Sequence, residues 1–359
     1  MSNIKVVVNL PEGASYDMRI GDTAADTLGA RCAACAPRAA RAVLVSDAHV
    51  AEAFGPFVRD QLAQVGLKVT DITLPSGRES KSADCALEIW SALASRGVAS
   101  DAVLVAVGGA NVLDIAGFAA HAYEGGLDAV LVPTTVHAMV RRCVGARSFV
   151  DVGDERDVLS VRIHPAYVCA DVRTLATTSD VSWQEGLADI AGWAFLDSDD
   201  FFFWLGDHAE ALDDRDTAVA SEAVARCAVA QADALVRTSA VLEAGAFGEE
   251  FGWALARAQG LDAIPPAYRA EGMRFSARLG VEVEGLSVEA VHALDALLAD
   301  LGLPVVAEAP DPDELIEELV RGSAVPAFLL PHDVGEWSVD RVDESVLREH
   351  VRAWARARS

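Results

Sequence analysis

Short apolar runs rich in β-branched residues alternate, in the first half of the chain, with segments in which apolar residues recur at helical spacing. The apolar runs cover residues 4–10, 42–46, 69–74, 102–107 and 129–133. Helical spacing is clearest over residues 50–65, 83–96 and 112–123. Strands separated by helices of this length predict βαβ units and a mostly parallel, Rossmann-like sheet. Ligands of such sheets bind at the carboxyl ends of the strands.

From about Asp180 onward the strand signal nearly disappears, and alanine- and leucine-rich stretches with helical periodicity replace it. These stretches cover residues 183–196, 217–242, 288–301, 312–321 and 346–356. Two short apolar runs, at 327–330 and 336–339, predict one small hairpin. We therefore expect an α/β N-terminal domain over residues 1–175 and an essentially all-α C-terminal domain over residues 176–359.

The composition suits two packed domains and restricts the partners. The chain has 359 residues, 52% of them hydrophobic, which is enough for two cores. Its 55 acidic residues outnumber its 29 basic ones and give a net charge of -26. Such a negative surface repels phosphate backbones and anionic lipids, so we expect no nucleic-acid or membrane partner. A small anionic ligand would need arginine or lysine concentrated locally.

The cysteines and the apolar segments point to a reduced, cytoplasmic protein. The first residues, MSNIKVVVNLPEG, lack a basic segment followed by a long apolar run, so no signal peptide is expected. The most apolar stretch, 102–113, is too short to span a bilayer. Cys32 and Cys35 form a CxxC pair, but no second pair completes a zinc site, and we interpret them as ordinary helical residues.

Four segments resemble the 3-dehydroquinate synthase family of sugar phosphate cyclases, in the family's order. They are LPSGRESKS at 74–82, VGGANVLDIAGFAAHAYEGG at 107–126 with VPTT at 132–135, QEGLADIAGW at 184–193, and AFLLPHDVGEWSV at 327–339. Iron-dependent alcohol dehydrogenases share the P-T-T element, but the GFAA run favours the synthases. The resemblance implies an NAD-binding N-terminal domain and a metal- and substrate-binding C-terminal domain. That family closes a seven-carbon sugar phosphate into 3-dehydroquinate through transient oxidation, phosphate elimination, reduction, ring opening and aldol closure.

NAD is the cofactor that this resemblance implies, and eight positions match the family's cofactor-binding residues. They are Asp47, Lys81, Gly108, Gly109, Asp114, Thr134, Thr135 and Thr177. Glycines at a strand end let the backbone approach a pyrophosphate, and an acidic side chain there can bind ribose hydroxyls. Glycines and threonines at strand ends can also serve only to turn the chain, and that alternative stays open.

The family's zinc ligands, a glutamate and two histidines, are replaced here. The glutamate position is Asp189, the only surviving candidate ligand position. The first histidine, expected after a glycine in an FGH-type turn, aligns with Trp253, and the neighbouring histidine aligns with Arg257. The last ligand falls near Pro265 and Pro266. These side chains cannot replace imidazole, so zinc is not expected, and the catalytic residues remain unknown.

Arginine replaces the family's substrate-binding side chains. The aspartate and lysine of its D-S-S-V-G-G-K-T segment are Arg141 and Arg147 here, and a later lysine is Arg156. The lysine after the metal carboxylate is Gly192, and a C-terminal lysine pair falls around residues 322–323. Guanidinium groups suit phosphate or carboxylate recognition, so an anion-binding cleft is one interpretation. A solvated or subunit-facing arginine face paired with carboxylates is the other.

Three functional hypotheses remain. The chain is a degenerate or rewired family member that binds a nucleotide or an anionic sugar phosphate, or both, without zinc-dependent cyclisation. It is alternatively an active, divergent cyclase, an NAD-dependent and phosphate-eliminating lyase. A third hypothesis is metal-free oxidoreduction with His137 or Tyr123 as the acid or base. The resemblance also implies a homodimer.

Overall fold

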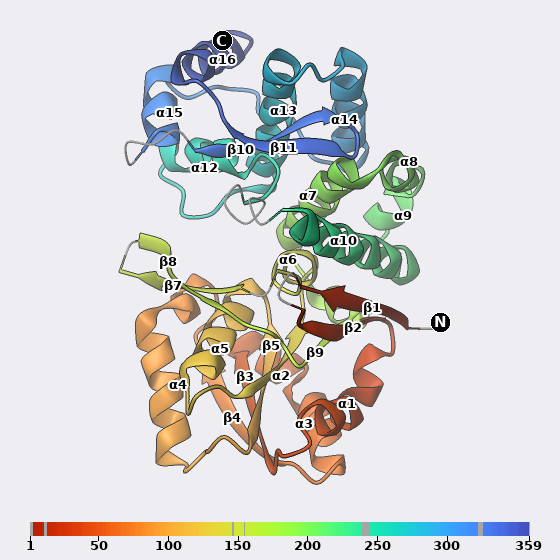
Figure 1. The fold of residues 1–359 in the computed structure, drawn as a ribbon, viewed down its shortest axis with the longest axis vertical. Helices are drawn as coiled ribbons and strands as arrows, with labels where there is room; N and C mark the ends of the chain where they lie inside the picture. The colour runs from red at the N-terminus through yellow and green to blue at the C-terminus, as the bar shows by residue number, and fades with distance from the viewer. Residues whose placement is uncertain are drawn as a thin grey trace. The chain divides into compact units, whose positions relative to one another are not determined.

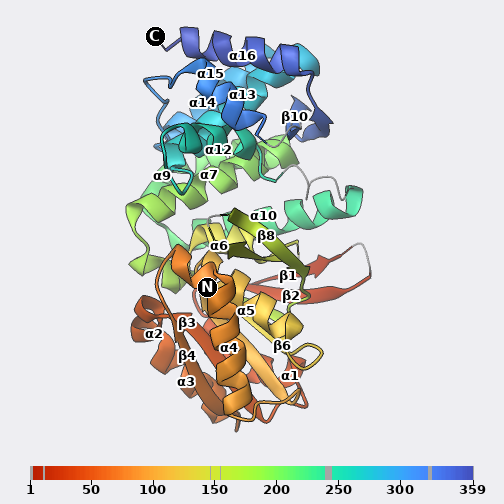
Figure 2. The same cartoon turned by 90° about the vertical axis from the view of Figure 1, so that its left-hand side faces the viewer.

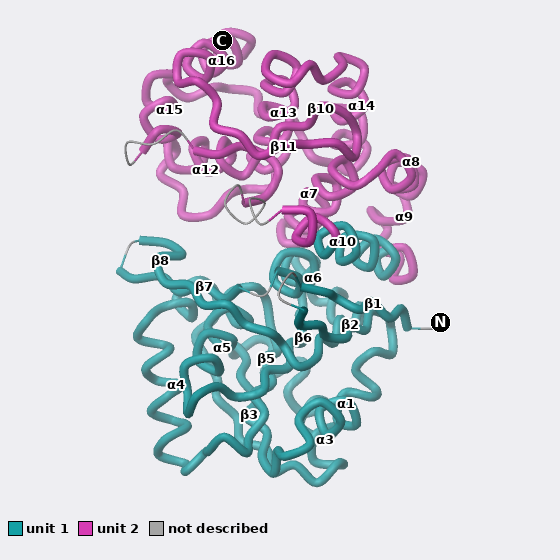
Figure 3. The backbone as a smooth tube through the Cα atoms, viewed as in Figure 1, with its two compact units in different colours: residues 1–179, 220–232 teal, residues 180–219, 233–359 magenta. Residues whose placement is uncertain are grey.

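The computed structural model describes residues 3–10, 13–145, 147–153, 155–238, 245–321 and 326–358. The chain forms two compact units (Figure 3). Unit 1 contains Met1–Ser179 and Ala220–Ala232, and unit 2 contains Asp180–Val219 and Asp233–Ser359. Among the described residues, none of the helices combines the length and the apolar character that crossing a bilayer requires.

Unit 1 is built on a seven-stranded sheet with the strand order β1-β2-β9-β6-β5-β3-β4. The strands are β1 (Ile4–Asn9), β2 (Ser15–Gly21), β3 (Arg41–Asp47), β4 (Lys68–Leu74), β5 (Ala102–Gly108), β6 (Asp128–Pro133) and β9 (Tyr167–Asp171). Only the β1–β2 pair of this sheet is antiparallel among the described strands. The predicted mostly parallel sheet is therefore confirmed.

Helices cover both faces of this sheet (Figures 1 and 2). The helical elements are η1 (Ala24–Thr27), α1 (Leu28–Cys35), α2 (Ala48–Ala53), α3 (Gly55–Gln64), η2 (Arg78–Lys81), α4 (Ala83–Ser95), α5 (Ala110–Ala122), α6 (Val136–Arg141) and η3 (Val172–Thr177). Leu28 of α1 and Leu62 of α3 pack against one face, in one core with Val103 and Val105 of β5. Helix α5 packs against β5 and β6. Each fully buried leucine contributes about 1.5–3 kcal/mol of apolar burial.

Several strands were not predicted from the sequence. A separate hairpin, β7 (Arg147–Val152) with β8 (Glu155–Arg162), is antiparallel, and β8 is largely exposed on both faces. It therefore carries no apolar alternation. Strand β9 has only five residues, and β2 alternates buried Tyr16, Met18 and Ile20 with polar side chains. Short or half-polar strands give a weak signal in one sequence.

Unit 2 is mainly helical and contains one hairpin, as predicted. Its elements are α7 (Asp180–Asp197), α8 (Asp199–Asp207), α9 (Ala209–Asp213), α12 (Glu249–Ala258), α13 (Pro266–Val283), α14 (Val288–Asp300), α15 (Pro312–Leu319), β10 (Ala327–Asp333), β11 (Glu336–Arg341) and α16 (Glu344–Arg356). Its core includes Phe251 and Phe275, whose ring centroids lie 3.7 Å apart. Helix α16 packs against α13 and α15 (Figure 2).

Helix α10 (Thr217–Arg237) has its middle part in unit 1 and its ends in unit 2. The Gln231 side-chain amide donates a hydrogen bond of 2.6 Å to the backbone carbonyl of Val140, which fixes the middle part to α6. Sequence patterning assigned all of this helix to the second domain. Helical periodicity shows which side of a helix is buried, but it does not show against which neighbour.

Candidate functional site

Five of the eight predicted cofactor positions lie at the ends of strands of the parallel sheet or just after them. Asp47 ends β3, Gly108 ends β5, and Thr134 comes after β6. Gly109 and Thr135 are the next residues along the chain. The backbone amide of Thr134 donates to the carbonyl of Gly108 at 3.0 Å, so two of these strand ends are joined. Parallel strands share a carboxyl edge, and the structure brings these residues together there.

The backbone at Gly109 is open to a ligand. Gly109 precedes α5, and no side chain caps that helix terminus. A Cβ atom added at Gly109 would meet only Thr135 Cγ2, at 3.8 Å. Gly108 is different, because a Cβ atom there would lie 2.7 Å from Val112 Cβ. Gly108 is therefore required for packing between strand and helix, while Gly109 exposes the N–H groups that bind anions at a helix start.

A cavity of about 220 Å³ lies at the same edge. Its lining includes Phe54, Phe57, Val107, Val132, Asp171 and Arg173. Asp171, at the end of β9, is buried and accepts a hydrogen bond of 2.9 Å from the Ala25 amide. A hydrogen bond from Arg173 to Asp171 is the main reason why the pKa of that arginine is raised. Asp171 was not among the sequence predictions, because β9 had not been recognised.

Three of the predicted polar residues, Asp47, Thr135 and Thr177, already have local partners. Asp47 accepts a hydrogen bond from the Val50 amide at 3.0 Å and caps α2. Thr135 caps α6, and the Thr177 hydroxyl donates to the carbonyl of Thr174. These contacts agree with the turn-forming alternative for these residues. A carboxylate and a hydroxyl each keep further hydrogen-bonding capacity, so a ligand role remains compatible.

Asp114 of α5 is held by two cations. The Lys81 ammonium lies 3.0 Å from Asp114 Oδ2, and Arg142 Nε lies 3.1 Å from the same oxygen. The Asp114 side chain is 1% exposed and the Lys81 side chain 7%. Lys81 also pairs with Asp157 of β8. The structure thus brings together two predicted residues, Lys81 and Asp114, in a buried ion-pair network.

The Phe149 ring gathers basic side chains next to this network. Lys81 Nζ lies 5.6 Å from the ring centroid, and the guanidinium carbons of Arg142 and Arg147 lie 5.3 and 5.4 Å away. Arg147 also donates to the Ser160 hydroxyl at 3.2 Å. Among the described residues, Arg147 therefore contacts a ring and a hydroxyl rather than a carboxylate. Its guanidinium can therefore also donate to an added anion.

The remaining predicted residues of unit 1 are more dispersed. Arg141 ends α6 and Arg156 lies in β8, and both are half-buried. His137 lies in α6. Tyr123 follows the last residue of α5, and its hydroxyl donates to the carbonyl of Val98. Because a helix of 13 residues is about 20 Å long, Tyr123 lies far from Gly109, which does not favour it as an acid or base for a nucleotide bound at Gly109.

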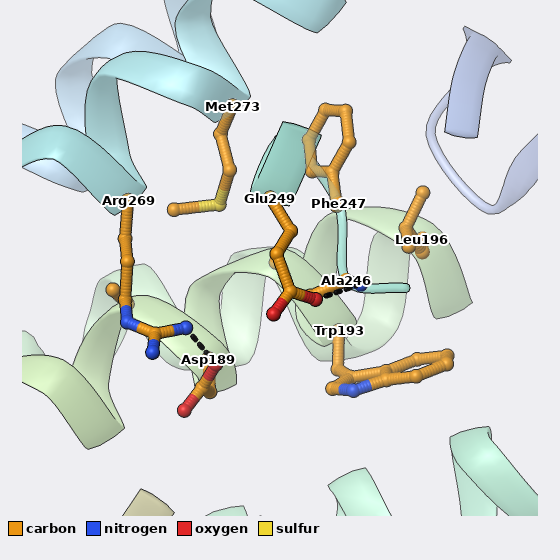
Figure 4. Close-up of a pocket in the computed structure, with 10 residues that line it drawn as sticks. Asp189, Trp193, Leu196, Ala246, Phe247, Glu249, Arg269 and Met273 are labelled. Atoms are coloured by element: carbon orange, nitrogen blue, oxygen red, sulfur yellow. Dashed lines mark hydrogen bonds and ion pairs between the residues drawn. The ribbon is translucent and has the colours of Figure 1, made fainter. Parts of the chain in front are cut away.

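In unit 2, Asp189 of α7 faces an arginine across a small pocket (Figure 4). Arg269 Nη1 of α13 lies 3.6 Å from Asp189 Oδ1, and Arg269 Nη2 lies 3.0 Å from Glu185 Oε1. Glu249, at the start of α12, points into the same space, and its carboxylate accepts a hydrogen bond from the Ala246 amide. The pocket has a volume of about 20 Å³, which leaves room for little more than a water molecule.

Comparison with known proteins decides the family. The model of the family described as 3-dehydroquinate synthase N-terminal matches residues 71–185. The 3-dehydroquinate synthase of Caulobacter vibrioides is 32% identical over an alignment of 365 positions that covers 96% of each chain. The chain belongs to the 3-dehydroquinate synthase family. The synthase of Rhodopirellula baltica is 28% identical over 302 residues, covering 82% of this chain and 80% of its own.

Solved structures agree on the fold of this family member. A 2-deoxy-scyllo-inosose synthase complexed with carbaglucose-6-phosphate, NAD+ and Co2+ matches with a TM-score of 0.84 at 17% identity, over 98% of this chain and 100% of its own. The 2-epi-5-epi-valiolone synthase of Streptomyces hygroscopicus, with NAD+ and Zn2+ bound, matches with a TM-score of 0.80 at 21% identity, over 96% and 98%. The synthase-like fold predicted from sequence is confirmed.

The backbone offers a second position for the predicted first histidine ligand. Gly248 has a φ of 76° and forms the turn before α12, whereas Gly252 lies inside that helix. If the FGH-type motif belongs to this turn, Glu249 stands at the first histidine position and Trp253 lies one helical turn later. Both alignments exist because Phe-Gly occurs twice, at 247–248 and 251–252. Arg257 is instead paired with Glu318 at 2.9 Å.

The turn is held close to α13. A Cβ atom on Gly272 would lie only 1.9 Å from the Gly248 carbonyl oxygen, so the two backbones touch. Pro265, near which the last ligand of the family was expected, is the N-cap residue of α13 and makes no side-chain capping hydrogen bond. The predicted lysine replacements around residues 322–323 lie outside the described residues.

The residues of this synthase-family pocket do not fit a catalytic zinc. A zinc site needs three donor side chains around one point. Within the described ranges, no group of three or more histidine, cysteine, aspartate or glutamate side chains is arranged to hold a metal ion. Two carboxylates, Asp189 and Glu249, do face the pocket, but the guanidinium of Arg269 is the cation that lies between the helices.

Proposed function

We propose that this family member binds a nicotinamide dinucleotide and an anionic sugar phosphate without catalysing zinc-dependent ring closure. The observation that carries the nucleotide part is the open backbone of Gly109, at the same edge of the sheet as the cavity of about 220 Å³. The residues of unit 2 do not fit the metal that the family's reaction requires, which supports the rest of the proposal.

The carboxyl edge of the sheet fits a dinucleotide chemically. The uncapped start of α5 offers backbone N–H groups to a pyrophosphate. Phe54 and Phe57 line a cavity with the apolar faces that a heteroaromatic base requires. Asp47 ends β3 at this edge, and its carboxylate can accept hydrogen bonds from ribose hydroxyls. When bound, NAD would supply a hydride acceptor, and these residues would bind and orient it.

The arginine-rich hairpin supports the anion part of the proposal. Among the described residues, the Arg147 guanidinium contacts the Ser160 hydroxyl and the Phe149 ring. It can therefore donate hydrogen bonds to a phosphate as a further partner. Arg142, in contrast, already pairs with Asp114. A sugar phosphate is the ligand class that agrees with the family.

A second candidate function is active sugar phosphate cyclisation. It is favoured by the 32% identity to the Caulobacter vibrioides synthase over 96% of both chains. The retained Lys81 and Asp114, which contact each other, also agree with it. This candidate requires a metal held in an arrangement other than the one in the structure.

The two candidates are separated by binding and turnover measurements on the same protein. We expect calorimetric titration with NAD+ to give one saturable site per chain. We expect no release of inorganic phosphate from the family's seven-carbon sugar phosphate when Zn2+ or Co2+ is added. Phosphate release at a rate proportional to protein would establish the cyclase, and an absence of NAD+ binding at millimolar concentration would refute the nucleotide proposal.

Arg147 provides the test of the anion site. Arg147→Ala is expected to weaken binding of the seven-carbon sugar phosphate by about tenfold or more, the effect of losing one charge-assisted contact. Arg59→Ala is the matched control, because Arg59 forms an exposed surface pair with Asp71 at 2.9 Å. Equal affinities of the two variants for the sugar phosphate would show that Arg147 does not contact it. The homodimer implied by the family stays a proposal, which light scattering of the purified chain tests.

A further inference from the structure

The pocket of Asp189 is organised around a positive charge that the chain itself supplies. Glu185 and Asp189 are one helical turn apart on α7 and therefore share a face. Arg269 reaches both from α13, at 3.0 Å from Glu185 and 3.6 Å from Asp189. Figure 4 shows the Glu249 carboxylate pointing into the same pocket from α12. Three elements of unit 2 thus place charged groups around one point.

The guanidinium is buried and strongly stabilised by these carboxylates. The side chain of Arg269 is 12% exposed, and that of Asp189 is 3% exposed. Burial lowers the pKa of Arg269, but the charges of Asp189, Glu185 and Glu249 together outweigh burial and raise it. A buried cation in this position needs its anions, and the buried carboxylates equally need a cation.

The space beside the guanidinium is small. The pocket of about 20 Å³ is bounded by Phe247, Met273 and Trp193. A Cβ atom on Gly192 would lie 3.3 Å from the Met273 sulfur. This volume suits about one water molecule beside Arg269.

We infer that Arg269 is the resident cation of this pocket and takes the place that a divalent metal ion holds in the family, so that unit 2 folds metal-free. This rests on the proposed metal-independent function. Its consequence is specific: the carboxylates of Glu185, Asp189 and Glu249 act as partners of an arginine rather than as ligands of a metal ion.

The test removes the positive charge of Arg269 and puts an uncharged side chain in its place. Arg269→Met leaves the carboxylates without a cation, and we expect the Tm to fall by about 6–20 °C, the range for breaking a buried pair. Arg257→Met is the control, because Arg257 makes a comparable contact with Glu318 at 2.9 Å but is 32% exposed. We expect the control to fall by about 4 °C at most.

Two further arms keep the inference testable if Arg269→Met folds poorly. The double variant Asp189→Asn/Arg269→Met removes anion and cation together, and we expect its Tm to lie above that of Arg269→Met. Millimolar Co2+ should also raise the Tm of Arg269→Met, while it leaves the wild-type Tm unchanged. Failure of both arms to restore stability would overturn the inference.

Metal content decides the same question directly in the wild-type chain. After incubation with Zn2+ or Co2+ and gel filtration, we expect less than about 0.1 metal ion per chain by mass spectrometry, because a site without three donors does not retain zinc. One ion per chain would refute the role of Arg269. NAD+ titration of the same preparation tests the proposed function separately, because a loss of nucleotide binding would leave the result for Arg269 unchanged.

Discussion

Replacing Lys81 by methionine tests whether the buried network around Asp114 stabilises unit 1. Lys81 Nζ and Asp114 Oδ2 are 3.0 Å apart, and both side chains are nearly inaccessible. Removing one partner of a buried ion pair costs about 3–5 kcal/mol when the other is left without compensation. Asp114 keeps Arg142 at 3.1 Å as a second cation. We therefore expect Lys81→Met to cost about 2–3 kcal/mol, below the full range.

Lys5→Met is a matched control for this variant. Lys5 pairs with Asp17 at 2.8 Å, an even shorter distance, but the two side chains are 42% and 34% exposed. Exposed pairs contribute at most about 1 kcal/mol. The comparison therefore contrasts a buried ion-pair network with an exposed pair of similar distance.

Hydrogen exchange followed by mass spectrometry is the suitable assay, because peptides from β5 and α5 report the opening free energy of unit 1 alone. A double-mutant cycle with Asp114→Asn should give a coupling energy of at least about 1 kcal/mol. Equal losses for Lys81→Met and Lys5→Met, or an additive cycle, would refute the reasoning that burial makes this pair strong.

Two further predictions concern ligand access and pH. Gly109→Val should lower NAD+ affinity by about tenfold or more with little change in Tm. The φ of -74° at this position suits any residue, while the valine side chain would cover the start of α5. Unchanged NAD+ affinity in calorimetry would contradict this prediction. Burial, with a further effect of Glu249, raises the pKa of Glu250 to about 7. The folded chain then binds a proton that the unfolded chain loses near pH 4.5, so stability should fall as pH rises from there to about 7. The Glu250→Gln variant should lack this fall of stability with pH, and its Tm at about pH 8 should be higher than that of the wild type. Parallel plots of Tm against pH for the two proteins would disprove the assignment of the raised pKa to Glu250.

The long, fully apolar elements were predictable because one physical signal dominates them. All seven residues of β5 are buried, and the apolar run at 102–107 predicted this strand within one residue. Strand β9 gave no comparable signal, and with it the sequence analysis missed Asp171, whose partner Ala25 lies 146 positions away. Local pattern determines local structure, but it carries no information about contacts between distant parts of the chain.

The candidate site shows the same division. Gly109, Thr134 and Asp114 could be named as candidates because their positions follow from strand ends and family motifs. Glu249 was not named because a repeated Phe-Gly allows two alignments that differ by four residues, and the backbone turn at Gly248 is visible only in the structure. Arg269 was missed because its partner Glu185 is 84 positions distant and nothing in the local sequence marks it as a charge partner.

The backbone contact between Gly248 and Gly272 has a mechanical consequence for the pocket beside it. Because no side chain separates the turn before α12 from α13 at that point, the two backbones are in direct contact and cannot move closer together. The spacing between Glu249 and Arg269 is therefore set by main-chain geometry. The chemistry of this pocket can be altered by substitution, but a ligand cannot widen it by pushing the two helices apart.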